Sequence, residues 1–454
     1  MLEKVHIFHT NDLHSHFNYW PRMQNYIKEM RLQLARQGET TFLFDVGDHV
    51  DRSNTYTEAT IGKGNVEMLN EAEYDVVTIG NNEGITLAFD ELVTLYDEAK
   101  FEVVVANLQA IEGENPKWMK PYTILTTAHG TKIAVIGATA QFEAFYKELN
   151  WTVDEPRSTI IRLAHQLRRE ADIVLCLSHL GITEDELLAE ECPELDVIFG
   201  SHTHHVLPEG KMVNGVLLTG GGKFGQFTGH LLLEYDNEQD RLVNKADVLM
   251  RNESLPSMEQ EASKVAFFEQ KGQQLLDYPV FTTNKYYNKE WFHYSQLSDL
   301  FAQAILKKSQ ADCALFNAGI FLDSIPKGNV TAYDLHKIFP HPINLCVMEL
   351  SVAQLKEIVQ QSKNEEWPRI ELKGLGFRGV IFGKMLLYRF SINDKRQLLI
   401  DGELADAKRT YKLVTLDLFT FGYFYPMFKC AQKRYILPDF LRDIMVEFCR
   451  EYFD

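Results

Sequence analysis

The stretch KVHIFHTND, Lys4–Asp12, is the first instance of a pattern that repeats along the first half of the chain. The stretch has the pattern of a β-strand and ends at two polar residues, Asn11 and Asp12. The segment that follows, up to Gly38, carries apolar residues at helical spacing. Strands that alternate with helices predict an α/β architecture around a largely buried sheet. The same strand pattern returns in TFLFDVGD, YDVVTIGNN, FEVVVANL, KIAVIGA, DIVLCLSHLG and LDVIFGSHTHH.

The pattern changes towards the second half of the chain. The stretch GVLLTGGGKFGQFTGHLLLEYD predicts two strands that return on each other around a glycine-rich turn. Residues 251–280 begin polar and become helical, whereas residues 281–454 mix helical segments such as QLSDLFAQAILKKS with strand segments such as KMLLYRFSI. We therefore expect a first domain over residues 1–250, a linker helix over 251–280 and a second, α+β domain over 281–454.

The composition restricts the class of protein. Hydrophobic residues make up 45% and charged residues 24% of the 454, which is typical of a folded chain. The formal net charge of −18 argues against binding of polymeric nucleic acid. No apolar run reaches the roughly 18 residues of a membrane span, and the N-terminus lacks the pattern of a secretion signal, so we expect a cytoplasmic protein without a membrane partner. The six cysteines are scattered and are expected to be reduced and mostly buried.

Side chains that can bind metals follow the ends of five of the predicted strands. Because ligands of open α/β sheets bind outside the carboxyl ends of the strands, we expect these side chains to converge. Carboxylate, imidazole and amide oxygen are ligands that Mn, Zn, Fe or Mg accept. Alone, each has an ordinary explanation, such as a helix cap, a turn or a core histidine, but together they suit two ions about 4 Å apart. The candidate ligands are Asp12, His14, Asp48, Asn81, His179, His202 and His204.

The order D-x-H, G-D, G-N-x-E, S-H and G-x-H-x-H resembles the signature of the calcineurin-like metallophosphoesterases. The opening HTNDLHSHF and the second domain make the chain similar to the 5′-nucleotidase and UDP-sugar hydrolase family, in its YunD-like bacterial branch. The resemblance implies a four-layer α/β/β/α domain followed by a smaller α+β domain of the 5′-nucleotidase C-terminal kind. It also implies two divalent ions, with manganese favoured, and a hydroxide that attacks phosphorus in line.

Carried over position by position, the resemblance assigns the ligands to two ions that share Asp48. Metal one would be bound by Asp12, His14, Asp48 and His204. Metal two would be bound by Asp48, Asn81, His179 and His202.

The sequence departs from the family at Asn82. The family usually writes G-N-H-[ED], where the histidine contacts phosphate and helps the leaving group depart, whereas this chain writes GNNE. The amide of Asn82 can donate a hydrogen bond to a phosphoryl oxygen, but it cannot deliver a proton. Since phosphate is a better leaving group than an alkoxide, we rank phosphoanhydrides and activated diesters above AMP as substrates. A neighbour such as His205 could supply the missing acid, which would reverse this ranking.

The second domain departs from the family as well. The stretch FNAGIFLDSIPKGNVTAYDLHKIFPHPIN has Leu322 where the family has a phosphate-binding arginine, and it keeps Asn344. In FGYFYPMF, Tyr425 beside Phe424 is the candidate for stacking on a base, with plain core packing as the alternative. Arg378 in GFRG is a candidate for a phosphate contact.

These observations favour a dimetal phosphohydrolase that acts on a nucleotide or another small phosphorylated metabolite, as in nucleotide catabolism, with the substrate held between the two domains. One alternative is a 2′,3′-cyclic-nucleotide phosphodiesterase, because related sites open cyclic phosphates. Another is a pseudoenzyme that binds metal and nucleotide without turnover, which Asn82 favours and the complete ligand set disfavours.

Overall fold

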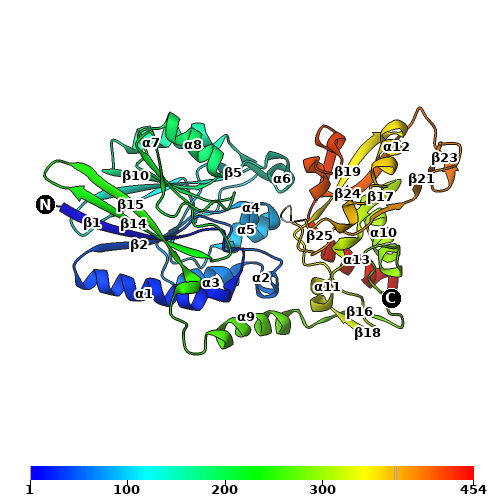
Figure 1. Cartoon of the computed structure of the whole chain (residues 1–454), viewed down its shortest axis with the longest axis horizontal. Coiled ribbons are helices and arrows are strands. Elements are labelled where there is room, and N and C mark those ends of the chain that lie inside the picture. The colour runs from blue at the N-terminus through cyan, green and yellow to red at the C-terminus, as the bar shows by residue number, and fades with distance from the viewer. Residues whose placement is uncertain (1, 373, 375, 454) are drawn as a thin grey trace. The chain divides into compact units, whose positions relative to one another are not determined.

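The computed structural model describes residues 2–372, 374 and 376–453 of the chain (Figure 1). The chain divides into two compact units, Met1–Gly272 and Gln273–Asp454. The helix in the predicted linker is α9 (Glu261–Leu276). At its N-terminus, Glu261 forms a bidentate ion pair with Arg22.

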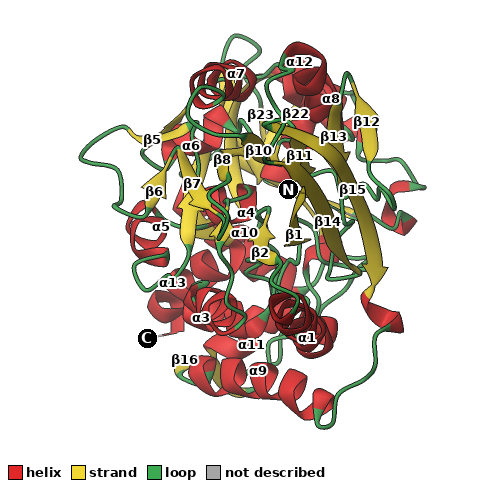
Figure 2. Cartoon of the chain, turned by 90° about the vertical axis from the view of Figure 1, so that its left-hand side faces the viewer, coloured by secondary structure: helices red, strands yellow, loops and turns green. Residues whose placement is uncertain are grey.

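The first unit contains two large sheets. The first has the order β15 (Arg241–Arg251), β14 (Phe227–Asp236), β1 (Leu2–Thr10), β2 (Thr40–Asp45), β3 (Val76–Val77), β4 (Glu102–Val104) and β6 (Met119–Lys120). The second has the order β12 (Lys211–Val213), β13 (Val216–Thr219), β11 (Val197–Gly200), β10 (Ile173–His179), β8 (Lys132–Thr139) and β7 (Tyr122–Thr126). A small pair joins β5 (Leu108–Ala110) to β9 (Trp151–Val153). Figure 2 shows β14 and β15 as a long pair beside β1.

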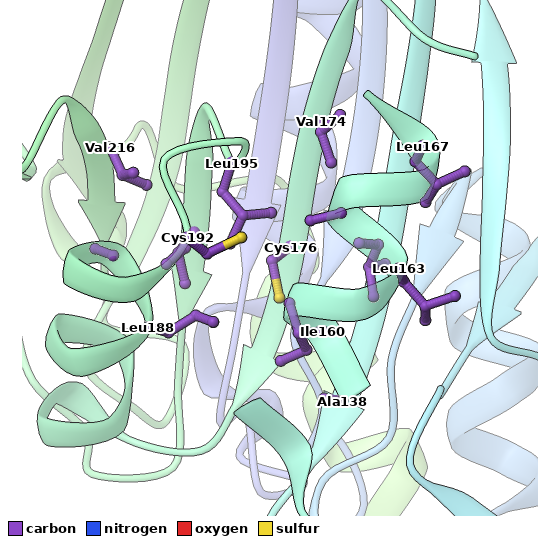
Figure 3. Packing of buried hydrophobic residues seen from close by; sticks show 14 of the residues in the cluster. Ala138, Ile160, Leu163, Leu167, Val174, Cys176, Leu188, Cys192, Leu195 and Val216 are labelled. Carbon is purple, nitrogen blue, oxygen red and sulfur yellow. The ribbon is translucent and has the colours of Figure 1, made fainter. Parts of the chain in front are cut away.

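The helices of this unit cover the sheets. They are α1 (Trp20–Arg36), α2 (Thr55–Thr60), α3 (Lys63–Glu71), α4 (Asn81–Thr86), α5 (Phe89–Leu95), α6 (Glu143–Glu148), α7 (Pro156–Leu167) and α8 (Ile182–Glu191). Alternate residues of β10 face opposite ways, as the strand period requires. Leu175 packs against the other sheet with Phe44, whereas Cys176 packs against α7 and α8 with Ile160 and Leu188 (Figure 3). This alternation gives the predicted four-layer fold, which is confirmed.

The strands that carry the candidate ligands end at shared edges. β1, β2 and β3 run parallel in one sheet, and β10 and β11 run parallel in the other. The loops after these strands therefore begin at the carboxyl edge of each sheet, as the sequence predicted.

The predicted pair of strands around the glycine-rich turn is wrong in one respect. β13 pairs with β11 and β12 in the second sheet, whereas β14 pairs with β1 and β15 in the first. Residues 220–226 thus form a crossing loop between the sheets and not a hairpin turn. Local sequence predicts the two strands but not their partners, because pairing depends on strands far away in the chain.

The second unit is built on one mixed five-stranded sheet. Its order is β20 (Met385–Tyr388), β17 (Cys313–Asn317), β24 (Thr410–Leu416), β19 (Asn344–Ser351) and β25 (Lys433–Phe440). Two smaller sheets join β16 (Pro279–Thr283) to β18 (Gly328–Thr331), and β21 (Phe390–Ile392) to β22 (Leu398–Ile400) and β23 (Glu403–Leu404). The helices are α10 (Gln296–Ser309), α11 (Ala332–Ile338), α12 (Val352–Gln361) and α13 (Leu441–Phe453). The prediction of an α+β unit is confirmed.

Two expectations from the composition concern the whole chain. The six cysteines are free and all except Cys430 are buried, as predicted. Within the part of the chain that the structure describes, no helix is both long and apolar enough to cross a membrane.

Asp417 is a buried carboxyl in the core of the second unit. Its Oδ2 accepts the backbone N–H of Asn344 at 3.0 Å. Burial raises the pKa of Asp417 to about 7, although the N–H groups of Asn344 and Leu418 act in the opposite direction. The folded state therefore holds this proton more tightly than the unfolded chain does, and stability is lost as the pH rises from about 4 to about 7.

We expect Asp417→Asn to stabilise the protein at high pH. The amide oxygen can still accept the N–H of Asn344, and the neutral amide does not have to be protonated in order to be buried. The gain in free energy of unfolding should approach about 4 kcal/mol above pH 7 and shrink towards pH 4. Thermal unfolding at about pH 5 and about pH 8 measures it. The control is Asp406→Asn, which changes an exposed carboxylate that also accepts a backbone N–H. A gain independent of pH contradicts the prediction.

Candidate metal centre

The backbone of the candidate ligands adopts a conformation that L-residues seldom occupy. Residues in the left-handed region cost about 1–3 kcal/mol each and persist where the surroundings fix them, often at functional sites. Five of the seven predicted ligands have positive φ: Asp12 (48°), His14 (48°), Asp48 (51°), His202 (70°) and His204 (55°).

Pairing between two loops holds this conformation. The N–H of Asp12 donates to the carbonyl of Gly47 at 3.0 Å, and the N–H of His14 donates to that of Asp48 at 2.8 Å. Ser15 donates to His49 in the same way at 3.0 Å. Residues 12–15 and 47–49 are therefore locked together, which brings the carboxylates after β1 and β2 to one place.

The first group of ligands is Asp12, His14 and His204. The Nε2 atoms of the two histidines lie 3.2 Å apart, and they lie 3.7 and 3.6 Å from Oδ1 of Asp12. Oδ2 of Asp48 lies 3.6 Å from Nε2 of His14. The ligand atoms of Asp12, His14 and His204 thus lie within 4.8 Å of one another, and Asp48 approaches this group at His14.

The second group consists of Asp12, Asp48 and His179, whose ligand atoms lie within 4.8 Å of one another. Nε2 of His179 lies 3.4 Å from Oδ1 of Asp48, and the ring of His202 lies 5.2 Å from that of His179. Among the described residues, Nε2 of His179 and Oδ1 of Asn81 are buried without a hydrogen-bond partner. A buried polar atom without a hydrogen bond is costly, which favours a bound ion as the partner of Oδ1 of Asn81.

The donor set fits divalent ions. Nδ1 of His179 donates to the carbonyl of Val46 at 2.8 Å, which leaves Nε2 as the ligand atom. Burial lowers the pKa of His202 and of His204 to about 4, so both rings are neutral. Although burial acts in the opposite direction, Asp48 raises the pKa of His179 to about 10, so an ion that binds there would displace a proton from this ring. Although burial acts in the opposite direction, His179 and His14 hold the pKa of Asp48 below its usual range. The carboxylate therefore stays ionised and takes a positive partner.

Several residues that position the ligands were not among the predicted site residues. Ser201 donates to Oδ2 of Asp12 at 2.7 Å. Oδ2 of Asp51 lies 3.6 Å from Nδ1 of His14. Glu83 is fully buried and accepts backbone N–H groups from Gly80 (2.8 Å), Asp48 (3.0 Å) and Val50 (2.9 Å). The glutamate of the G-N-x-E motif was the available signal for Glu83.

Asn82 lies inside the protein. Its Nδ2 lies 2.9 Å from Nδ1 of His14 and donates to the carbonyl of Val50 at 3.1 Å, and its Oδ1 lies 3.2 Å from Nδ2 of Asn81. Its backbone N–H donates to Oδ1 of Asp48 at 2.7 Å. The carboxamide is thus committed to contacts with His14, Val50 and Asn81.

His205 is likewise held by the protein. Its Nε2 donates to the carbonyl of Thr219 at 3.3 Å, and its Nδ1 lies 3.1 Å from Oγ1 of Thr203. Burial lowers the pKa of His205. Both ring nitrogens are therefore in contacts within the unit.

The predicted stacking residues of the second unit lie in its core. Tyr425 is fully buried and its hydroxyl contacts Ser362 at 2.7 Å, while Phe424 stacks on Phe382 with centroids 4.2 Å apart. This placement favours the core-packing alternative. Two rings of the same segment are exposed, Tyr423 with 69% and Phe421 with 45% of its surface accessible, and the sequence did not single out either of them.

The other two predicted substrate contacts also serve the unit itself. Nδ2 of Asn344 donates to the carbonyls of Pro438 (3.2 Å) and Asp439 (2.9 Å). Arg378 is half-buried, and its backbone N–H donates to Nδ1 of His341 at 2.9 Å.

We expect Glu83→Gln to weaken metal binding. The glutamine side chain has one oxygen and one NH₂ group, so it cannot accept all the backbone N–H groups that the two oxygens of Glu83 accept. The loop that carries Asp48 should therefore shift. Affinity for Mn²⁺, measured by titration calorimetry, should fall about tenfold or more, and the melting temperature should fall by several degrees. The control is Glu91→Gln, because Glu91 caps α5 as Glu83 caps α4. Unchanged Mn²⁺ affinity contradicts a positioning role.

Comparisons with known proteins agree with this geometry. The model of the Calcineurin-like phosphoesterase family matches residues 5–206, and that of the 5′-nucleotidase C-terminal domain matches residues 271–429. YunD, an uncharacterized metallophosphoesterase of Bacillus subtilis (strain 168), is 39% identical over 98% of this chain and 99% of its own length. Protein UshA of Escherichia coli (strain K12) is 22% identical over 91% of this chain and 84% of its own.

Solved structures share the fold over the full length. A putative 5′-nucleotidase from Staphylococcus aureus has a TM-score of 0.69 at 18% identity, covering 98% of this chain and 96% of that chain. The NAD nucleotidase of Haemophilus influenzae has a TM-score of 0.66 at 16% identity, covering 99% and 96%. The family uses a dimetal centre. The chain therefore belongs to the calcineurin-like metallophosphoesterases of the 5′-nucleotidase type and is a metal-dependent phosphoric ester hydrolase.

Proposed function

We propose that the protein is a dimetal phosphohydrolase that prefers nucleotide anhydrides, such as a UDP-sugar, to nucleoside monophosphates. The observation that carries the metal part is the convergence of the imidazole nitrogens of His14 and His204 and a carboxylate oxygen of Asp12 within 3.7 Å of one another. The family relationship supports a nucleotide-type substrate.

Each ion has its own set of ligands in this proposal. Asp12, His14, Asp48 and His204 hold the first ion. Asp48, Asn81, His179 and His202 hold the second. When bound, the ions supply an activated water and neutralise charge on the phosphoryl oxygens. Mn²⁺ is the favoured ion, because the set combines carboxylate, amide and imidazole without thiolate.

The contacts of Asn82 and His205 support the preference for anhydrides. General acid catalysis requires a group that can reach the leaving oxygen with a proton. Asn82 carries no such proton and faces His14, and both ring nitrogens of His205 are in contacts within the unit. Neither residue is free to protonate an alkoxide. A leaving group that is itself a phosphate departs without that proton. The lack of a general acid should therefore slow the hydrolysis of anhydrides less than that of monoesters.

The deciding experiment measures phosphate or nucleotide release from UDP-glucose, AMP and 2′,3′-cyclic AMP after loading with Mn²⁺. We expect UDP-glucose to be the best substrate and AMP to be poor. Asn82→His should raise kcat/KM for AMP by at least about tenfold, because it introduces a general acid, and should leave UDP-glucose little changed. Asp48→Ala, which removes the shared ligand, is the inactive control.

Metal content measured for each variant separates loss of ions from loss of chemistry. If AMP is already the best substrate, or if histidine at position 82 gives no gain, the ranking of anhydrides is wrong. If the Mn²⁺-loaded protein acts on none of the three compounds, the proposed activity itself is wrong.

We propose that Tyr423, and not Phe424 or Tyr425, is the stacking residue for a base. Its ring is exposed, whereas the faces of its neighbours are covered. Because stacking on a base contributes about 1–3 kcal/mol, Tyr423→Ala should raise KM for UDP-glucose about tenfold and leave p-nitrophenyl phosphate unchanged. Tyr286→Ala, which removes another exposed tyrosine of the same unit, is the control. Equal KM values for wild type and Tyr423→Ala contradict the assignment.

A further inference from the structure

The crossing loop, residues 220–226, is bonded directly to the segment that bears Asp12. The N–H of Phe224 donates to the carbonyl of Asp12 at 2.8 Å. The side chain of Asn11 accepts from the N–H of Gly221 at 3.0 Å and donates to the carbonyl of Gly222 at 2.8 Å. Nδ2 of Asn11 also donates to Oδ2 of Asp12 at 2.7 Å. The loop is therefore built as part of the metal centre.

Phe224 occupies a strained position in this loop. Its φ is 60°, which is rare for a bulky residue, and Gly222 and Gly225 on either side have φ of 70° and 64°. The conformation places the phenyl ring 3.8 Å from the ring of His16 and 5.7 Å from that of the ligand His14. Strain of this kind persists where the surrounding bonds fix it, and it clusters at functional sites.

Lys223 is the cation that this loop presents. It is half-buried, and its Nζ lies 4.6 Å from the centroid of the Phe224 ring. Among the described residues, no carboxylate lies within ion-pair distance of this ammonium, although the chain has a net charge of −18. The Phe224 ring that the ammonium contacts lies 5.7 Å from the ring of the candidate ligand His14, which places Lys223 on the side of the loop near the metal centre.

We propose that Lys223 binds the departing phosphate of a phosphoanhydride substrate and is the specificity-determining residue for that substrate class. An ammonium without a carboxylate partner, held beside the metal ligands, is free to bind an anionic oxygen. A monoester offers one phosphoryl group, which the ions hold. An anhydride has a second phosphate, and Lys223 gives it a partner. The inference rests on the proposed function and names the group that recognises its substrate.

The chemistry balances without a general acid. The oxygen of water bonds to one phosphorus, and the bond from that phosphorus to the bridging oxygen breaks. The bridging oxygen keeps the electron pair and leaves as part of the second phosphate. The two protons of the water are divided between the product phosphates and the solvent. The negative charge that grows on the leaving phosphate is stabilised by Lys223, which is why a proton donor at position 82 is not needed.

A binding measurement tests the inference apart from turnover. Methylenediphosphonate carries two phosphonates that cannot be hydrolysed apart, and inorganic phosphate carries one. We expect Lys223→Met to lower the affinity for methylenediphosphonate about tenfold or more in titration calorimetry of the Mn²⁺-loaded protein. The affinity for inorganic phosphate should change by less than about threefold. Lys223→Arg should retain most of the affinity. Lys211→Met, which removes an exposed lysine of the same unit paired with Glu186, is the control.

Kinetics give a second readout. Lys223→Met should lower kcat/KM for UDP-glucose about tenfold or more and leave that for p-nitrophenyl phosphate nearly unchanged, with an unaltered Mn²⁺ content. The inference is overturned if Lys223→Met loses affinity equally for methylenediphosphonate and inorganic phosphate, or if it loses affinity for neither. If the wild type hydrolyses no anhydride, the proposed function fails, and the binding of methylenediphosphonate still decides whether Lys223 holds a second phosphate.

Discussion

The three backbone hydrogen bonds between residues 12–15 and 47–49 are the constraint on which the site depends. They hold Asp12, His14 and Asp48 at positive φ, a conformation that none of these residues favours alone. The strain is tolerated because the loops satisfy each other and because Glu83 accepts three N–H groups that would otherwise be buried without partners. These backbone hydrogen bonds thus fix the positions of the candidate ligands without the help of a bound ion.

The two sheets bring the remaining ligands to the same place. Val46 and Ser201 contact His179 through Nδ1, so loops from both sheets fix one imidazole. Ser201 also donates to Asp12, which ties the second sheet to the first. A centre assembled across two sheets needs a rigid interface between them, and the apolar layer around Phe44, Leu175 and Phe199 provides it.

Asn82 and Lys223 are the two residues on which the proposed preference for anhydrides depends. Asn82 replaces a proton donor by an amide that contacts His14 and Val50. Lys223 adds a positive charge, without a carboxylate partner among the described residues, on a loop bonded to Asp12. In the proposed function, both residues favour stabilisation of the charge on the leaving group over transfer of a proton to it. A phosphate can leave in this way, whereas an alkoxide cannot, since its stability in water depends on acquiring a proton.

The sequence by itself determined the α/β class, the second unit and the seven candidate ligands, because hydrophobic periodicity and motif order are local properties. It did not determine that β13 and β14 belong to different sheets, or that the ring of Tyr425 is buried and that of Tyr423 exposed. Nor did it single out Lys223, whose importance comes from the loop bonded to Asp12. Only the tertiary structure decided these points, because strand partners, burial and the neighbours of a charge depend on residues far apart in the chain.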